Sequence, residues 1–261
     1  MALHSPLPLP SPAPRRRDAC LRLRLADGCA TTLHVASYAP ERVRLRVAAL
    51  AGPSRLVRWC SDQAVGDAIV GGFFVRPGGT PLGELWIGGG RRTSAGFDAP
   101  WDGLRACIAI DDGAIRIARR CDLPDARGPL GDLLQAGPLL VDHGVNVVAP
   151  GDDPEGFSAG ARQFDSDITA GRYPRAALGI GRGRLIAVAC DGRGSEDAGL
   201  SLSELADALI GLGAREAINL DGGGSTSLVS DGRLRNHPRE EHGVELLGGR
   251  EISTALVFEP V

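Results

Sequence analysis

The stretch most suggestive of chemistry is a carboxylate followed by three glycines and two hydroxyls, at residues 221–226. Asp221 comes directly after the apolar run 217–220, which predicts a short buried strand. The glycines let the backbone approach a ligand closely or adopt a positive φ, and the amide groups of such a turn can cradle an anion. A tight structural turn, in which Asp221 bonds its own loop, fits the same residues. The pattern therefore leaves two interpretations open: a ligand-binding loop with Asp221 as its carboxylate, or a structural turn that Asp221 stabilises.

The composition restricts how an anionic ligand could be held. The chain contains no lysine, so all 29 basic residues are arginine. A Walker-type phosphate loop, a pyridoxal Schiff base and a lysine nucleophile are therefore excluded, and we expect no cofactor. A formal net charge of -3 argues against a nucleic-acid partner. Any phosphate must be bound by arginine or by backbone amides.

Cysteine and histidine give no recognisable metal motif. None of the six cysteines forms a C-x-x-C pair, and Cys107 and Cys190 lie in apolar runs typical of small core residues. His237 and His242 stand five residues apart in a polar stretch and match no zinc motif, so they are interpreted as surface-loop histidines. We expect no metal. A G-x-S-x-G elbow is also absent, which leaves a serine nucleophile without local support.

The elements that must position these residues are mostly strands. Residues 19–58 alternate apolar and charged positions, which predicts half-buried strands with one solvated face. Hairpins are predicted at 111–113, 181–183 and 231–232. The polar segment 150–172 is long enough for a lid or a substrate-contacting loop. The pattern favours an α+β fold with a mixed β-sheet, several hairpins and few helices.

The clearest helix is predicted over residues 202–212. Ser201 and Glu204 form an S-x-x-E capping box, and Gly213 provides the end. Residues 1–18 are rich in proline and end in three arginines, which predicts a flexible arm before a single domain over 19–261. No stretch approaches the apolar length of a membrane span, and the order of proline and charge is unlike a signal peptide, so a cytoplasmic location is expected.

The segment 219–226 also carries a family resemblance. It matches the N-L-D-G-G-G-S-T signature of the phosphodiester glycosidase family, and the preceding helix resembles that family's L-x-E-L-A…L-G-A segment. Four more segments resemble family elements in the same order: 71–83 (G-G-F-F…G-T-P-x-G), 135–141 (G-P-L-L-V), 172–179 (R-H-P-R-T-A-I-G) and 191–193 (D-G-R). The resemblance covers about residues 65–258.

The resemblance implies an enzyme that hydrolyses a sugar 1-phosphodiester, such as N-acetylglucosamine on a mannose 6-phosphate, at the anomeric carbon. The phosphate monoester that departs is an acceptable anion, so one carboxylate and a cationic phosphate site suffice. Asp221 is the expected catalytic carboxylate, with Asp191 second and Glu84 third. Arg175 and Arg193 are the expected phosphate partners, because guanidinium grips phosphate oxygens in a fork. The other residues expected to contact the glycan or small-molecule substrate are Gly222, Gly223, Gly224, Ser225, Thr226, Gly72, Phe73, Gln135 and Gly137.

Three positions depart from the family pattern. Val70, Tyr173 and Ala176 stand where the family has Asn, His and Thr, and each change removes a polar group near the expected site. The departures imply either a different substrate or reduced activity. Two other functions therefore stay open: a non-catalytic sugar-phosphate binding module, and a phosphodiesterase that cuts P–O rather than C–O.

Overall fold

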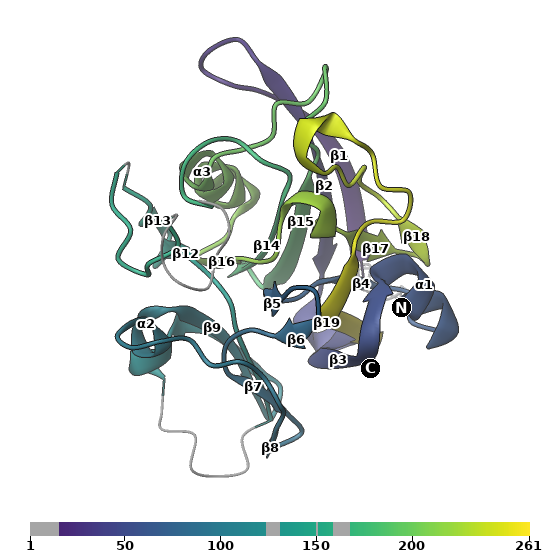
Figure 1. Cartoon of the computed structure of the whole chain (residues 1–261), viewed down its shortest axis with the longest axis vertical. Coiled ribbons are helices and arrows are strands. Elements are labelled where there is room, and N and C mark those ends of the chain that lie inside the picture. Colours follow the sequence, from purple (N-terminus) through teal and green to yellow (C-terminus); the bar gives the residue numbers. More distant parts are fainter. Residues whose placement is uncertain (1–15, 124–130, 150, 159–167) are drawn as a thin grey trace, which may run out of the picture.

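A computed structural model describes residues 16–123, 131–149, 151–158 and 168–261 of the chain. Three antiparallel sheets and a small two-stranded ribbon form most of this part, and helices are few (Figure 1). The α+β class holds in the sense that one long helix packs on a fold dominated by sheets. No helix among these residues is long and apolar enough to cross a membrane.

The largest sheet has seven strands and carries the long helix on one face. Its helix, α3 (Leu202–Leu212), buries Leu205 and Leu209 against apolar residues of the sheet such as Val188. The strands lie in the order β1 (Arg16–Arg24), β2 (Ala30–Tyr38), β15 (Arg184–Cys190), β14 (Arg175–Gly181), β16 (Glu216–Asn219), β12 (Leu139–Asp142) and β13 (Val145–Asn146).

The opposite face of this sheet contributes to the main core. There Leu178 and Ile218 belong to one buried cluster with Val47 and Leu256, which lie in a five-stranded sheet. That sheet has the order β18 (Arg233–Leu234), β17 (Leu228–Ser230), β4 (Ala68–Val70), β19 (Glu251–Pro260) and β3 (Val43–Arg55). Short helix α1 (Leu56–Asp62) follows β3 directly.

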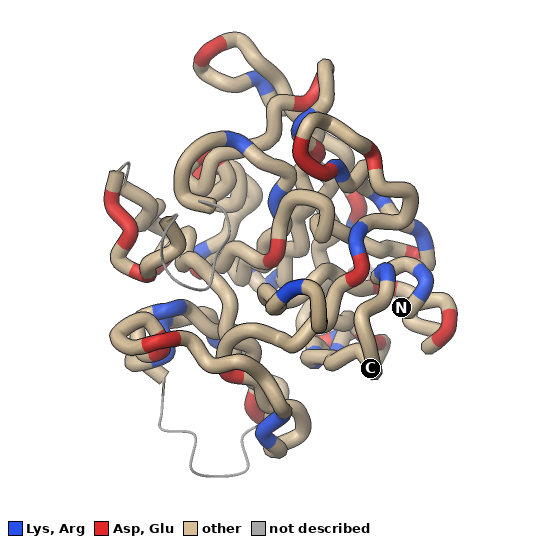
Figure 2. Tube along the Cα trace, viewed as in Figure 1, with Lys and Arg blue, Asp and Glu red and all other residues tan. Residues whose placement is uncertain are grey.

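A second five-stranded sheet occupies the lower part of Figure 1. Its order is β10 (Ala114–Arg119), β9 (Ala106–Asp111), β11 (Asp132–Gln135), β7 (Leu85–Ile87) and β8 (Gly90–Arg91), with α2 (Trp101–Leu104) beside it and the ribbon β5 (Phe74–Val75) and β6 (Thr80–Pro81) between the sheets. Acidic and basic positions are interspersed along the trace rather than separated into halves (Figure 2).

The predicted helix and hairpins are confirmed. The Ser201 hydroxyl accepts a hydrogen bond from the Glu204 amide at 3.2 Å, the Glu204 carboxylate accepts one from the Ser201 amide at 2.9 Å, and Gly213 ends α3 with a φ of 100°. The turns at 111–113, 181–183 and 231–232 join β9 to β10, β14 to β15 and β17 to β18. Cys107 and Cys190 are buried, as predicted.

The mixed sheet is a wrong prediction. Every ladder between the described strands is antiparallel, and the parallel pairing among them is a single isolated bridge between Leu82 and Ala95. The tight hairpins explain part of this result, because a two- or three-residue connection can only join antiparallel neighbours.

The N-terminal strand departs from prediction in two ways. Strand β1 begins at Arg16, inside the segment predicted as a flexible arm, and Arg16 forms an ion pair with Asp67 at 2.8 Å. The strand is also largely exposed on both faces, with Leu21 36% exposed. Among the described strands it pairs only with β2 and lies at the edge of its sheet, so the alternating sequence does not bury one side against a core. Residues 1–15 of the predicted arm lie outside the described residues.

Candidate active site

Two carboxylates predicted for the site follow strands that end at the same edge of the large sheet. Strands β15 and β16 are both antiparallel to β14, which lies between them, so their carboxyl ends meet beside the start of β14. Asp191 follows β15 and Asp221 follows β16. Pro174, just before β14, links the two loops: its carbonyl accepts the Gly223 amide at 2.8 Å, and a Cβ on Gly192 would lie 2.7 Å from its nitrogen.

Asp221 is a half-buried carboxylate with a perturbed acidity. Its amide donates to the Gly71 carbonyl at 3.0 Å, and its Oδ1 accepts the Gly222 amide at 2.9 Å. Desolvation raises the pKa of Asp221 to about 6, although the Ser225 hydroxyl and the charges of Arg250 and Arg76 act to lower it. A carboxylate of this pKa is charged at neutral pH and can still take up a proton, which suits a base.

The glycine loop is a 3₁₀ turn over Gly223–Ser225, and its amides are mostly engaged within the protein. Those of Gly222 and Gly223 donate to Asp221 and Pro174, and those of Ser225 and Thr226 donate back to the Gly222 and Gly223 carbonyls. The predicted backbone cradle for an anion is therefore wrong for these four amides, because the turn consumes them. Gly223 has a φ of 59°, as glycine freedom predicted.

The loop instead offers buried oxygens. Within the described part of the chain, Thr226 Oγ1, Ser227 Oγ and Asn219 Oδ1 are buried without a hydrogen-bond partner. Ser225 Oγ is buried too, close enough to Asp221 to lower its pKa but outside standard hydrogen-bond geometry. Unpaired buried polar groups cost free energy, so several on one short loop are expected where a ligand or water completes the bonding.

Arg193 is the guanidinium that faces this loop. Its Nη1 lies 3.2 Å from where a Cβ on Gly223 would stand, and it donates to the Arg239 carbonyl at 3.3 Å. The guanidinium carbon is 5.3 Å from the centre of the Tyr173 ring. None of the described carboxylates forms an ion pair with Arg193, which has a φ of 57° and is half-buried. Its charge is thus available to an anionic ligand beside Asp221.

Arg175 is placed differently from its predicted role. It is 3% exposed, and its Nε donates to the Leu200 carbonyl at 2.7 Å. Its Nη2 donates to the carbonyls of Ile168 and Gly171 at 2.9 and 3.3 Å. A guanidinium committed to three carbonyls cannot also present its fork to phosphate, so the geometry makes Arg175 a positioning residue for residues 168–171.

The structure describes part of the segment 150–172, which was predicted as a lid or a substrate-contacting loop. Residues 150 and 159–167 lie outside the described residues. Glu155, within the described part, is buried and accepts the amides of Ala106 and Leu139 at 2.9 and 2.8 Å. Burial raises the pKa of Glu155 despite these bonds. Glu155 therefore joins two sheets, whereas Gly151, Asp152 and Pro154 in the same segment are exposed.

Asp191 is buried with both carboxylate oxygens engaged. Its Oδ2 lies 2.8 Å from His34 Nε2 and 3.2 Å from His237 Nδ1, and its Oδ1 accepts the His237 amide at 2.7 Å. Burial raises the pKa of Asp191, but these hydrogen bonds outweigh it and leave the pKa lowered. Because both of its oxygens already accept hydrogen bonds, Asp191 is poorly placed to take a proton from water. This argues against Asp191 as the catalytic carboxylate, for which it was the second candidate.

The interpretation of His237 as an idle surface histidine is wrong in part. Its side chain is 60% exposed, yet it contacts Asp191. His34, which the sequence did not single out, is almost buried on β2 and completes the group. No local signal could have found it, because His34 lies 157 positions from Asp191. Among the described residues, these three form the group whose ligand atoms are close enough to hold a metal ion.

A second carboxylate near the glycine loop was also missed. Glu240 Oε1 lies 2.9 Å from where a Cβ on Gly224 would stand and accepts a hydrogen bond from Arg250 Nε at 2.9 Å. The Arg250 amide in turn donates to the Gly224 carbonyl at 2.8 Å. The side-chain bond from Arg250 outweighs burial and lowers the pKa of Glu240. Its position in the polar stretch after Asn236 gave no sequence signal.

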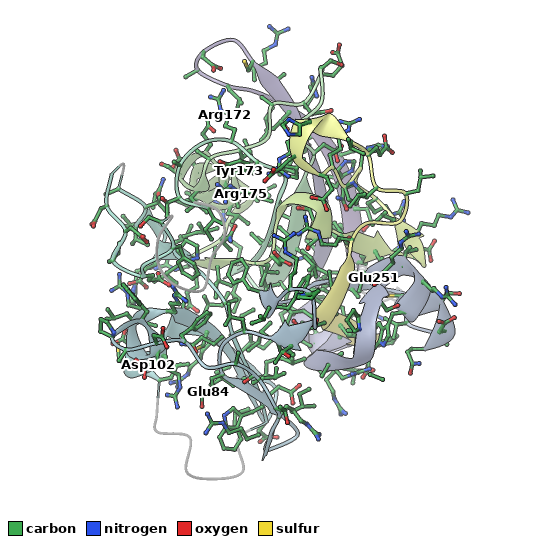
Figure 3. All side chains as sticks on the ribbon, in the orientation of Figure 1. Glu84, Asp102, Arg172, Tyr173, Arg175 and Glu251 are labelled. Atoms are coloured by element: carbon green, nitrogen blue, oxygen red, sulfur yellow. The ribbon has the colours of Figure 1, made fainter. Side chains whose placement is uncertain are left out.

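Glu84, the third catalytic candidate, lies far from this edge. It precedes β7 in the lower part of the molecule, as does Asp102 of α2, whereas Tyr173 and Arg175 lie in the upper part (Figure 3). Its carboxylate pairs with Arg120 at 2.5 Å and accepts the Trp86 indole N–H at 2.7 Å. These bonds outweigh burial and lower the pKa of Glu84. Glu84 is therefore a structural ion-pair partner rather than a third catalytic carboxylate.

The remaining predicted contacts are packed around the strand ends. Gly72 donates to Thr254 Oγ1 at 3.0 Å, and a Cβ there would come 3.1 Å from the Gln135 carbonyl. The Gln135 side chain is buried and donates to the Asp102 carbonyl at 2.7 Å, so it is not free for a ligand. Phe73 belongs to a small apolar cluster with Phe97 and Phe157.

Gly137 contacts strand β16, which leads to Asp221, through its backbone. Its amide donates to the Asn219 carbonyl at 3.1 Å and its own carbonyl accepts from Asn219 Nδ2 at 3.1 Å. A Cβ at its φ of 113° would meet Glu155 at 2.8 Å. Gly137 thus positions the strand that ends at Asp221.

The three departures from the family pattern fall into two groups. Val70 and Ala176 are fully buried in the main core, which suits an apolar side chain. Tyr173 is half-buried at the site and its ring lies near both Arg175 and Arg193. Only Tyr173 changes the surface next to Gly223.

The chain resembles known proteins both in sequence and in fold. The family model for phosphodiester glycosidase matches residues 64–259. The chain is 31% identical over 177 residues to N-acetylglucosamine-1-phosphodiester alpha-N-acetylglucosaminidase of Bos taurus, and 30% identical over 200 residues to that of Homo sapiens. These matches cover 65% and 73% of this chain but 32% and 37% of the relatives, so the chain spans about a third of their length.

Solved structures share the fold. The zebrafish enzyme of that name, a catalytic domain auto-inhibited by its pro-peptide, has a TM-score of 0.71 at 19% identity and covers 95% of this chain and 85% of its own. A hypothetical protein from Synechocystis has a TM-score of 0.66 at 20% identity, covering 93% and 62%. With the family model spanning most of the sequence, the chain belongs to the phosphodiester glycosidase family.

Proposed function

We propose that this chain is a hydrolase that cleaves a sugar 1-phosphodiester between the anomeric carbon and the bridging oxygen. The proposal rests on one juxtaposition: the Asp221 carboxylate and the Arg193 guanidinium both border the Gly222–Gly223 turn. Family membership supports an activity of the phosphodiester glycosidase type. The curated relatives, named for N-acetylglucosamine-1-phosphodiesters, suggest that sugar as the first one to test.

The chemistry needs few groups because of the bond that breaks. Ordinary glycosidases protonate an alkoxide leaving group with a second carboxyl. A phosphate monoester leaves as an anion, so its charge needs a cation rather than a proton. Arg193, with no ion pair to a described carboxylate, supplies that cation.

Asp221 supplies the negative charge at the anomeric carbon. It either takes a proton from the attacking water or attacks the carbon itself and is released by water in a second step. In both routes the C–O bond breaks, and its electron pair stays on the phosphate oxygen. The raised pKa of Asp221, about 6, makes the carboxylate a stronger base than an exposed aspartate.

Hydrolysis in ¹⁸O-water tests the proposal, with the methyl diester of N-acetylglucosamine 1-phosphate as substrate. We expect the label in the sugar, because water oxygen ends on the anomeric carbon. Label in the phosphate instead would mean P–O cleavage by a phosphodiesterase. Failure to turn over a panel of sugar 1-phosphodiesters, together with measurable binding, would identify a binding module. Asp221→Asn serves as the inactive control for background hydrolysis.

A further inference from the structure

His34, Asp191 and His237 come from three separate segments and bring two imidazole nitrogens and a carboxylate oxygen together. The donor atoms all lie within 4.8 Å of one another. Both imidazoles converge on the same oxygen, Asp191 Oδ2, at 2.8 and 3.2 Å. We propose that this group is a site for a divalent transition metal of the Zn²⁺ type.

The donor set selects this class of ion. Imidazole with carboxylate suits Zn²⁺ and its first-row neighbours, whereas Ca²⁺ and Mg²⁺ prefer a shell of oxygens. Ligand distances of about 2.0–2.2 Å around tetrahedral Zn²⁺ place neighbouring donors about 3.3 Å apart. The two observed contacts to Asp191 need to open by only a few tenths of an ångström to reach that spacing. The distance between the two imidazole nitrogens, which lie within 4.8 Å of each other, must match this spacing as well, and the exposed His237 side chain can move to adjust it.

The surroundings hold the donors in place before any ion binds. Asp191 is 2% exposed; its amide donates to the Thr32 carbonyl at 2.9 Å and its carbonyl accepts the Thr31 hydroxyl at 2.7 Å. The His237 amide occupies Asp191 Oδ1, which turns Oδ2 towards the rings. His34 is fixed on β2 opposite Ala189. Such oriented carboxylate–histidine contacts raise metal affinity.

The site is open on one side. His34 and Asp191 are buried, but the His237 side chain is 60% exposed. Three protein ligands with access to solvent leave a fourth position for water or an anionic oxygen. This differs from a closed structural site, in which four protein ligands surround the ion.

The two segments that would be tied by the ion also hold Arg193. Asp191 precedes Arg193 by two residues, and His237 precedes Arg239, whose carbonyl accepts Arg193 Nη1 at 3.3 Å. Metal occupancy is thus expected to fix the guanidinium beside Gly223. This consequence rests on the proposed function, whereas the metal site itself does not.

The test uses tag-free, full-length protein treated with EDTA and dialysed, then titrated with Zn²⁺ calorimetrically and with Co²⁺ by visible absorption. We expect one equivalent of Zn²⁺ to bind and Co²⁺ to give the intense d–d bands of a site with nitrogen ligands. His237→Ala and Asp191→Asn should each weaken binding by about tenfold or more. His143→Ala is the matched control, because this exposed histidine also contacts an aspartate, Asp142, at 2.6 Å but has no third ligand among the described residues.

The outcomes separate the metal site from the proposed function. Lack of Zn²⁺ binding, or binding unchanged in His237→Ala, would mean that Asp191 merely orients two imidazoles and would overturn the site. His237 is exposed, so this variant is expected to fold, and circular dichroism checks it. Metal binding that persists while no sugar diester is hydrolysed would leave the site standing and remove the function. A KM that falls when Zn²⁺ is restored would support the positioning of Arg193.

Discussion

The guanidinium of Arg193 lies against the backbone of Gly223, so that a Cβ on this glycine would come within 3.2 Å of Nη1. The contact joins the loop after β15 to the loop after β16 and brings a positive charge beside the carboxylate loop of Asp221. It also accounts for the glycine at position 223, which combines a φ of 59° with a close neighbour. The predictions below follow from this relationship.

The rate of diester hydrolysis should rise with pH through the ionisation of Asp221 and then stay level. The carboxylate is the reactive form, and desolvation raises its pKa to about 6. Because the phosphate leaves without a proton, no fall is expected at higher pH from a general acid. The measurement is kcat/KM from pH 4 to 9. A bell-shaped profile would reveal a second titrating group, and Glu240 would be the first to examine.

Asp221→Asn should lower kcat by about 10² or more, while ligand still binds, on the usual scale for such catalysis. The same change should increase stability above pH 6. A carboxyl whose folded pKa exceeds its unfolded value binds more protons when folded, so stability falls as pH rises through about 4 to 6. Removing the ionisable group removes this loss, which we put at about 1–2 kcal/mol for a half-buried group. Urea unfolding at pH 5 and pH 8 measures it; an equal effect at both values would contradict the assignment.

Arg193→Lys should reduce kcat/KM by about 10- to 100-fold with little change in stability, because ammonium cannot reproduce a bidentate bond to phosphate. Arg182→Lys is the matched control. Arg182 also has a positive φ, 47°, but it lies in the turn between β14 and β15, at the far end of β14. Equal kinetics for both variants would remove Arg193 from the phosphate site.

Arg175→Lys should act mainly on the fold. The lysine cannot reach all the carbonyls of Leu200, Ile168 and Gly171 at once, and leaving them unpaired costs about 1–3 kcal/mol. Thermal unfolding should therefore shift to lower temperature, and the activity per folded molecule should change less than in Arg193→Lys. If Arg175→Lys instead left the protein stable but removed its affinity for phosphate, Arg175 would contact the phosphate directly, as the sequence predicted.

Gly223→Ala should impair substrate binding beyond its backbone strain. Any Cβ at this φ costs about 1–2 kcal/mol, and here it also presses on Arg193. Gly183→Ala reports the strain alone, because Gly183 has a φ of 66° and no atom near its Cβ position. We expect similar losses of stability in the two variants but a raised KM only in Gly223→Ala, as measured by steady-state kinetics.

Much of this protein could be predicted from local patterns in the sequence. The capping box at Ser201, the glycine at 213 and the three turn sequences each set hydrogen bonds within a few residues, and the structure has the expected helix and hairpins. The signature around Asp221 likewise marked the family, which the comparisons confirm. Such features depend on short-range sterics and hydrogen bonding, which a single segment encodes by itself.

Contacts between distant segments were decided only by the tertiary structure. Burial turned Arg175 towards backbone carbonyls, and β2 brought His34 to Asp191 across 157 positions. The exposure of β1 followed from its place at a sheet edge, although its alternation matched that of a half-buried strand. Residue type and spacing state which groups a segment offers. Which of them face solvent, a carbonyl or one another depends on how the sheets stack, and that arrangement is set by the whole chain.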